Sequence, residues 1–242
     1  MNENFDRIKI IEKILLLTKN VRRIPFSDFS RIYIPSEQFR LTLKGLEDRG
    51  LIDLKKGTLE VSKTQRIRLA FTALTEHMSL EMICRSLEWD EFEQLLSTLF
   101  SHHDYTVRRN LHIKHRGKRL QIDILAVKDQ VILCVDCKHW RYGYSQSRMK
   151  TAAKKQEARA KAVTPSLLIS QKNTRNRRFY VVPVILVLLD IPFRFIGNIP
   201  IVPVHRLNDF LDNFPPIPDS RFKYFTVKDV DDSIHLSYEG FP

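Results

Sequence analysis

The apolar positions in the first third of the chain predict a small module of helices and a hairpin. Apolar side chains recur at helical spacing over residues 5–17 and 36–49, with the short segment PFSDFSRIYI between them. LIDL and TLEV then alternate apolar and polar positions, which is typical of two short strands, and the turn KKGT joins them. A linking helix is predicted for residues 64–77, so a first domain over residues 1–76 is expected.

The remainder, residues 77–242, alternates helices and strands. LEWDEFEQLLSTLF predicts a helix with one apolar face, made of Trp89, Phe92, Leu96 and Leu99. Three strands follow, with turns at Gly117 and at Asp129-Gln130, and then a helix of small and basic residues. The strands FYVVPVILVLL and PIVPV and a last helix complete the chain. This order predicts an α/β fold with a central mixed sheet covered by helices on both faces.

The first domain resembles the winged-helix family through the run LKGLEDRGLIDLKKGTLEVS, which follows the order of helical segments and then a hairpin. The resemblance implies that the helix over residues 36–49 is a recognition helix and that the hairpin is a wing. The implied DNA-contacting residues are Arg40, Lys44, Lys55 and Lys56. Because the net charge of this region is close to zero, contact with another protein is the alternative.

The positive charge of the chain, formally +12, belongs to one region. Residues 101–180 contain nineteen Lys or Arg against five Asp or Glu, whereas residues 1–100 contain sixteen against fifteen. A field of this size attracts polyanions, of which nucleic acid is the commonest in cells, so DNA is the predicted partner. A charged surface that only keeps the protein soluble is the alternative.

Three features predict a cytoplasmic protein without a membrane partner. The longest apolar run, which starts at Val181, has about eleven residues and contains a proline, too short to cross a bilayer. The segment MNENFDRIKI lacks the pattern of a signal peptide. Three cysteines are an odd number at no disulfide-framework spacing, which fits a reducing compartment.

Charged residues interrupt the apolar stretch QIDILAVKDQVILCVDCKHW. A hairpin turn at Asp129-Gln130 pairs positions whose numbers sum to about 259, which sets Asp123 opposite Asp136. Lys138 lies on the same side of its strand as Asp136. Two adjacent carboxylates are costly near an apolar sheet unless a cation compensates them, and oxygen ligands favour Mg²⁺ or Mn²⁺. A structural ion-pair network at a sheet end is the alternative.

WDEFEQLL, QIDILA and VDCKHW, in this order, resemble the PD-(D/E)xK nuclease superfamily and within it the Mrr-like restriction endonuclease branch. The resemblance implies a restriction-endonuclease-like fold in which Asp123, Asp136 and the carbonyl of Cys137 hold the metal. It also implies that Lys138 orients the attacking water and that Glu93 completes the site. The sequence departs from the family in having aspartate where the second acid is often glutamate, and no glycine-rich loop precedes Gln121. A solvated helix residue is the alternative for Glu93.

Further basic residues are predicted to contact the DNA backbone or to form a solvated helix face. They lie in the turn after the first strand of the sheet and on the helix that follows the site, at Arg116, Lys118, Lys150, Lys154, Lys155 and Arg159. Gln156 and Glu157 lie on the same helix, where some relatives have a further site residue, and their role stays open.

These features together predict a Mg²⁺-dependent DNA endonuclease that needs no small-molecule cofactor. Cutting both strands of a duplex usually needs two active sites, so a homodimer is expected. Two alternatives remain. One is a repair or junction-resolving nuclease on the same fold, and the other is a DNA-binding regulator without catalytic activity.

Overall fold

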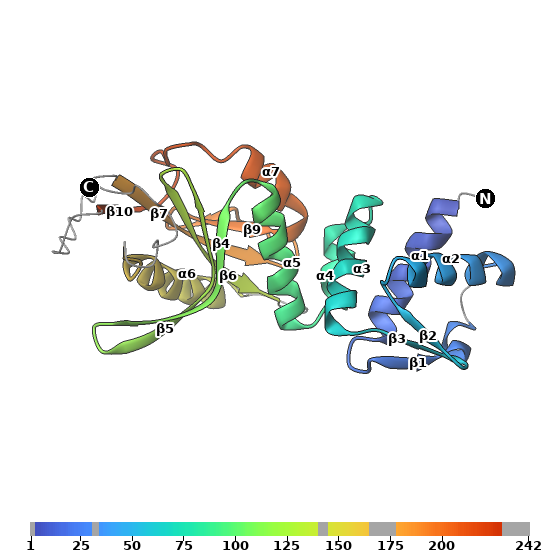
Figure 1. Cartoon of the computed structure of the whole chain (residues 1–242). Helices are drawn as coiled ribbons and strands as arrows, with labels where there is room; N and C mark the ends of the chain where they lie inside the picture. Colours follow the sequence, from blue (N-terminus) through green and yellow to red (C-terminus); the bar gives the residue numbers. More distant parts are fainter. Residues whose placement is uncertain (1–2, 31–33, 140–144, 165–177, 229–242) are drawn as a thin grey trace. The chain divides into compact units, whose positions relative to one another are not determined.

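The structure is a computed structural model that describes residues 3–30, 34–139, 145–164 and 178–228 (Figure 1). The chain forms two compact units, Met1–Leu95 and Leu96–Pro242. The division between them falls inside one helix, α5 (Trp89–His102). The domain boundary predicted after residue 76 lies further toward the N-terminus and stays a prediction.

The first unit combines helices with a small antiparallel sheet (Figure 1). Its elements in chain order are α1 (Glu3–Leu17), β1 (Arg23–Pro25), the 3₁₀ helix η1 (Phe26–Phe29), α2 (Ser36–Asp48), β2 (Asp53–Lys55), β3 (Thr58–Glu60), α3 (Lys63–Thr75) and α4 (Leu80–Ser86). The strand order is β1-β3-β2. The predicted helices and hairpin are present within a few residues of their expected bounds. The sequence did not predict β1 or α4, because three and seven residues are too few for a periodic pattern.

Local signals explain where the helices of this unit begin and end. Gly50 follows α2 with φ of +65°, a conformation that glycine adopts without steric cost and that commonly ends a helix. Ser62 and Gln65 form a reciprocal capping box at the start of α3, each side chain bonding the backbone N–H of the other. Both signals are present in the sequence.

A buried arginine ties four helices of the first unit together. Arg66 on α3 and Glu91 at the start of α5 are both fully buried, and two nitrogens of the guanidinium donate to the two carboxylate oxygens at 2.9 and 3.1 Å. The other donors of Arg66 reach α1 and the end of α4, at the carbonyls of Leu15 and Ser86 and the hydroxyl of Thr18. All hydrogen-bonding capacity of the guanidinium is therefore used.

The second unit has a seven-stranded mixed sheet with strand order β4-β5-β6-β7-β9-β8, and β10 also pairs with β7. The elements after α5 are β4 (Thr106–His115), β5 (Lys118–Lys128), β6 (Val131–Lys138), α6 (Gln146–Lys161), β7 (Arg178–Val187), β8 (Phe195–Ile196), β9 (Ile199–Pro203), the 3₁₀ helix η3 (Val204–Arg206), α7 (Leu207–Asp212) and β10 (Phe225–Lys228). The pairs β6·β7 and β7·β9 are parallel and the others are antiparallel. The α/β fold with a central mixed sheet flanked by helices is confirmed.

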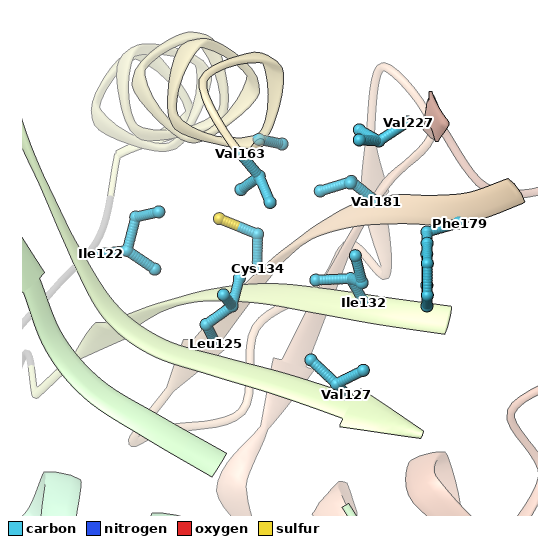
Figure 2. Packing of buried hydrophobic residues seen from close by; sticks show 10 residues of the cluster. Ile122, Leu125, Val127, Ile132, Cys134, Val163, Phe179, Val181 and Val227 are labelled. Atoms are coloured by element: carbon cyan, nitrogen blue, oxygen red, sulfur yellow. The ribbon is translucent and has the colours of Figure 1, made fainter. Parts of the chain in front are cut away.

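Apolar packing fixes α6 on one face of this sheet. Ala160 of α6 and Val163, two residues after this helix ends, pack with Cys134 of β6 and Phe179 of β7 in one buried cluster (Figure 2). Seven of the eight residues of β6 are buried, as expected for a strand with a neighbour on each side and helices over the sheet. The helix that connects the parallel strands β6 and β7 is thereby held over the strand that carries Asp136.

The predicted register of the β5–β6 hairpin is confirmed. The pairs run from Ile124 opposite Val135 to Lys128 opposite Val131, so that residue numbers sum to 259. Asp129 adopts φ of +53° in the turn, a conformation that aspartate tolerates better than most residues. Trp89, predicted on the apolar face of α5, lies next to Phe92, with ring centroids 6.2 Å apart, but it is 43% exposed while Phe92 is fully buried. Trp89 is the first residue of α5, where the end of a helix leaves room for contact with solvent.

No helix within the described ranges combines the length and the apolar character that a membrane span requires.

Candidate active site

Two aspartates meet where β5 and β6 run side by side. Asp123 is the residue before the first β5–β6 pair, and its Oδ2 accepts a hydrogen bond of 2.8 Å from the backbone N–H of Cys137. Asp136 precedes Cys137 on β6. Asp123 and Asp136 are 6% and 1% exposed, so both carboxylates are buried. The hairpin register, readable from the sequence, brings them to this point.

Two cations surround Asp136. Nζ of Lys138 lies 2.8 Å from Oδ1 and 2.7 Å from Oδ2, and a guanidinium nitrogen of Arg159 lies 3.1 Å from Oδ1. Oδ2 is buried and accepts no hydrogen bond of regular geometry from the described part of the chain. Its interaction with Lys138 is therefore an ion pair without a hydrogen bond. The cluster therefore contains two carboxylates and two cations, and the charges balance.

The environment of Asp123 disfavours its ionised form. Burial raises the pKa of Asp123, and the negative charge of Asp136 raises it further, while the hydrogen bond from Cys137 and the charges of Lys138 and Arg159 oppose the shift. The net direction is upward. Buried acids with raised pKa values and specific charged neighbours are concentrated at functional sites.

Gln156 of helix α6 also contacts strand β6, which carries Asp136. Gln156 is fully buried, and its Nε2 donates to the backbone carbonyl of Cys134 at 2.5 Å. Its Oε1 in turn accepts a hydrogen bond of 3.2 Å from Arg159, which links the helix to the acid cluster. Helical spacing in the sequence was a signal that Gln156 is buried, because residue 156 lies one turn from Ala152 and one turn from Ala160, which are both buried. Glu157 instead pairs with Lys161 and Lys223 at 2.8 and 2.9 Å.

The backbone of β4 is irregular at the level of Asp123. Asn110 adopts φ of +51°, a left-handed conformation that is uncommon for residues other than glycine. The pairs of β4 with β5 continue on either side of it, at Arg109 opposite Ile124 and Leu111 opposite Ile122. The interruption therefore falls where the register brings β4 to Asp123. Non-glycine residues in this conformation cluster at functional sites.

The predicted DNA-contacting residues fall into three groups. Lys44 pairs with Glu47 and Asp48, at 2.9 and 3.2 Å, and Lys55 pairs with Glu60 at 2.5 Å. Arg159 is directed at Asp136 rather than outward along α6, because it shares the buried side of the helix with Gln156. The remaining predicted residues have exposed side chains, namely Arg40, Lys56, Arg116, Lys118, Lys150, Lys154 and Lys155.

Glu93 and the cysteines complete the predicted set. Glu93 lies on the half of α5 that belongs to the first unit and is only 6% exposed, so it is not a solvated helix residue. Its role as the helix glutamate of the site stays a prediction. Cys134 and Cys137 are buried and are not joined in a disulfide, and burial raises the pKa of the Cys134 thiol, which makes it a poor nucleophile and metal ligand. The metal-facing role of the Cys137 carbonyl stays a prediction.

The donor set suits a hard divalent cation. Within the described ranges, no three His, Cys, Asp or Glu side chains are grouped so that they would hold a metal by themselves. Mg²⁺ does not need such a cage, because it retains several waters and binds through one or two carboxylates. Asp123 and Asp136 provide these two, and Oδ2 of Asp136 is a buried oxygen that receives no regular hydrogen bond from the residues that the structure describes.

We expect Asp123→Asn to stabilise the second unit at pH 7. An acid with a raised folded-state pKa contributes stability below its unfolded pKa, and this contribution is lost as the pH rises through the folded pKa. At pH 7 the wild type therefore carries an unfavourable ionised group, whereas asparagine keeps the acceptor for Cys137 without the charge. Thermal unfolding should show a higher Tm for the variant at pH 7, with a difference that shrinks toward pH 4. A lower Tm of the variant at pH 7 would contradict the conclusion that the ionised form of Asp123 is unfavourable in the folded protein.

Comparisons with known proteins give a family for this part of the chain. Residues 88–187, which include Glu93, both aspartates, Lys138 and Arg159, match the family described as the nuclease-related domain (NERD). An uncharacterised protein from Archaeoglobus fulgidus is 30% identical over 130 residues, which cover 52% of this chain and 92% of that protein. The chain belongs to the same family as this archaeal protein, and residues 88–187 are its nuclease-related domain.

A solved structure, protein VC1899 from Vibrio cholerae, gives a weaker match. It is 12% identical with a TM-score of 0.39, over 85% of this chain and 49% of that chain. The chain thus spans about half the length of this solved relative.

Proposed function

We propose that this protein is a metal-dependent DNA endonuclease whose active site is built from Asp123, Asp136 and Lys138. The observation that carries the proposal is the buried pair of aspartates on adjacent strands, with the Lys138 amine within 2.8 Å of Asp136, inside a nuclease-related domain. A D…DxK arrangement of this kind is the site that the resemblance to PD-(D/E)xK nucleases implies. Mg²⁺ or Mn²⁺ would be held by the two carboxylates with the carbonyl of Cys137.

The bound metal would lower the pKa of a water molecule and stabilise negative charge on the phosphate. The residues of the chain have separate tasks. The backbone N–H of Cys137 orients the carboxylate of Asp123 through a hydrogen bond of 2.8 Å. Lys138, 21% exposed at its side chain, can turn from Asp136 toward a phosphate or a water at the same site. Arg159 remains beside Asp136 and keeps the site from being too acidic for a polyanionic substrate.

The first unit is proposed to be a winged helix that contributes to DNA or protein contact. The order of α1, η1 and α2 followed by the β2–β3 hairpin supports this proposal, as does the antiparallel sheet that β1 forms with the hairpin. The ion pairs of Lys44 and Lys55 with neighbouring acids reduce the positive field of this unit, which favours a minor share of the DNA affinity. A homodimer that cuts both strands of a duplex is part of the same proposal.

Metal removal tests the proposed activity. We expect the purified chain to nick or linearise plasmid DNA in Mg²⁺ or Mn²⁺, and EDTA to abolish this activity because two carboxylates alone do not activate water. The double variant Asp123→Asn, Asp136→Asn serves as the control for a contaminating nuclease. Cleavage that persists in EDTA, or that the double variant retains in Mg²⁺, would contradict the proposal.

A further inference from the structure

The β4–β5 hairpin continues past the sheet as a two-stranded ribbon, residues 111–122 (Figure 1). β6 pairs with β5 only from Ile124 to Lys128, so within the described part of the chain residues 118–122 pair with β4 alone. A two-stranded ribbon is only marginally stable by itself, so one of its faces has to pack against another part of the protein.

One side of the ribbon supplies this packing. Leu111 and Ile113 of β4 are half-buried and pack against the apolar cluster under α6, together with the fully buried Ile122 of β5. The strands alternate, so the opposite side carries the cross-strand pairs His112–Gln121 and Lys114–Arg119, and all four side chains are exposed. The ribbon is anchored by its apolar side and presents a polar, basic side.

The ribbon contains no acidic residue that could compensate its cations. Residues 106–122 contain six Lys or Arg and no Asp or Glu. The four cations of the ribbon, Lys114, Arg116, Lys118 and Arg119, form no ion pair with any residue in the described ranges. Lys114 directly opposes Arg119, an arrangement of like charges that destabilises a hairpin. An external polyanion would relieve this repulsion.

The tip of the ribbon has a second unfavourable feature of the same kind. Arg116 and Gly117 form the two-residue turn with φ of +49° and +75°. Such a turn favours asparagine or aspartate followed by glycine, because the first residue has to adopt a left-handed conformation. The chain has a long cation at this position, so the turn extends the positive charge to the end of the ribbon at a cost in local stability.

We infer that the β4–β5 ribbon is a DNA-binding arm that lies in the major groove of duplex DNA next to the cleavage site. The major groove admits a two-stranded β-ribbon, and cations along one face and at the tip reach the phosphates on both walls of the groove. β5 itself leads from the ribbon to Asp123, one residue beyond Ile122. The inference rests on the proposed function for its link to cleavage, and the ribbon would position DNA relative to the two aspartates.

The double variant Lys114→Gln, Arg119→Gln tests this arm through binding rather than cleavage. With a duplex of about 25 base pairs in EDTA, we expect Kd to rise roughly 10- to 100-fold at 0.1 M salt. The slope of log Kd against log salt should fall by about 2, because two phosphate contacts are lost. The matched control is Arg194→Gln, Arg221→Gln in the same unit, which removes the same charge from arginines that pair with Asp190 and Asp219. This control should bind like the wild type.

Two outcomes separate the arm from the nuclease proposal. If the ribbon variant binds like the control, the arm is refuted, whatever the wild type cleaves. If binding weakens as expected while the wild type cleaves no DNA, the arm stands and the proposed activity fails. The fold of the variant is checked by circular dichroism, which should not change, and by its Tm, which should be unchanged or higher because cross-strand repulsion is removed.

Competition with groove-binding ligands tests the groove assignment. Methyl green, which occupies the major groove, should compete with binding, and competition by the minor-groove ligand distamycin alone would overturn the groove assignment.

Discussion

Asp136→Asn is expected to lower the rate of DNA cleavage by at least about 100-fold, while the affinity for DNA stays the same or increases. Asparagine has nearly the same shape as aspartate, so Lys138 and Arg159 keep their places, but the charge that would hold the metal is gone. The site then has two cations against the single carboxylate of Asp123, and this net positive charge attracts phosphate more strongly. Single-turnover cleavage in Mg²⁺ and binding in EDTA measure the two effects separately.

The matched control for this experiment is Glu157→Gln on α6. This variant also removes one carboxylate charge near the sheet, but Glu157 pairs with Lys161 and Lys223 rather than with the acid cluster. It should cleave like the wild type. Equal activity of Asp136→Asn and the control would remove Asp136 from the mechanism. Lys138→Met should also lower cleavage, with little effect on Mg²⁺ affinity.

Arg66→Met is expected to destabilise the first unit by about 3–5 kcal/mol. Methionine has a similar volume and leaves the core filled, but Glu91 is then a buried carboxylate without its bidentate partner, and the carbonyls of Leu15 and Ser86 lose their donors. Arg22, 3.3 Å from Glu91, and the backbone N–H of Glu88 remain as partners of this carboxylate, so the lower end of this range is expected. Urea unfolding followed by a probe in the first unit measures the change in the free energy of unfolding.

An exposed pair provides the comparison for this variant. Arg85 bonds Glu81 one turn away on α4 at 2.7 Å, and Arg85→Ala should cost less than about 1 kcal/mol. The double variant Arg66→Met, Glu91→Met should recover part of the loss, because the buried charge disappears with its partner. A cost for Arg66→Met no larger than that for Arg85→Ala would show that the buried pair does not organise the unit.

The acid cluster and the buried ion pair differ in how far the sequence predicted them. Asp123, Asp136 and Lys138 were predictable because one short hairpin carries them, and its turn and alternation set the register. Arg159 was expected along the DNA backbone, and in the structure it faces Asp136. Glu91 is adjacent to other acids in the sequence, yet it is fully buried, because Arg66, 25 positions earlier, compensates its charge.

The sequence by itself determined the longer helices and strands, the mixed sheet class and the hairpin register, because periodicity, turn residues and strand alternation act over a few neighbouring positions. Only the tertiary structure decided which partners the charges have. Whether Arg159 meets phosphate or carboxylate depends on how α6 packs over β6, and whether the ribbon cations have acids beside them depends on distant segments. Such contacts arise from packing between residues far apart in the chain, and local sequence patterns do not encode them.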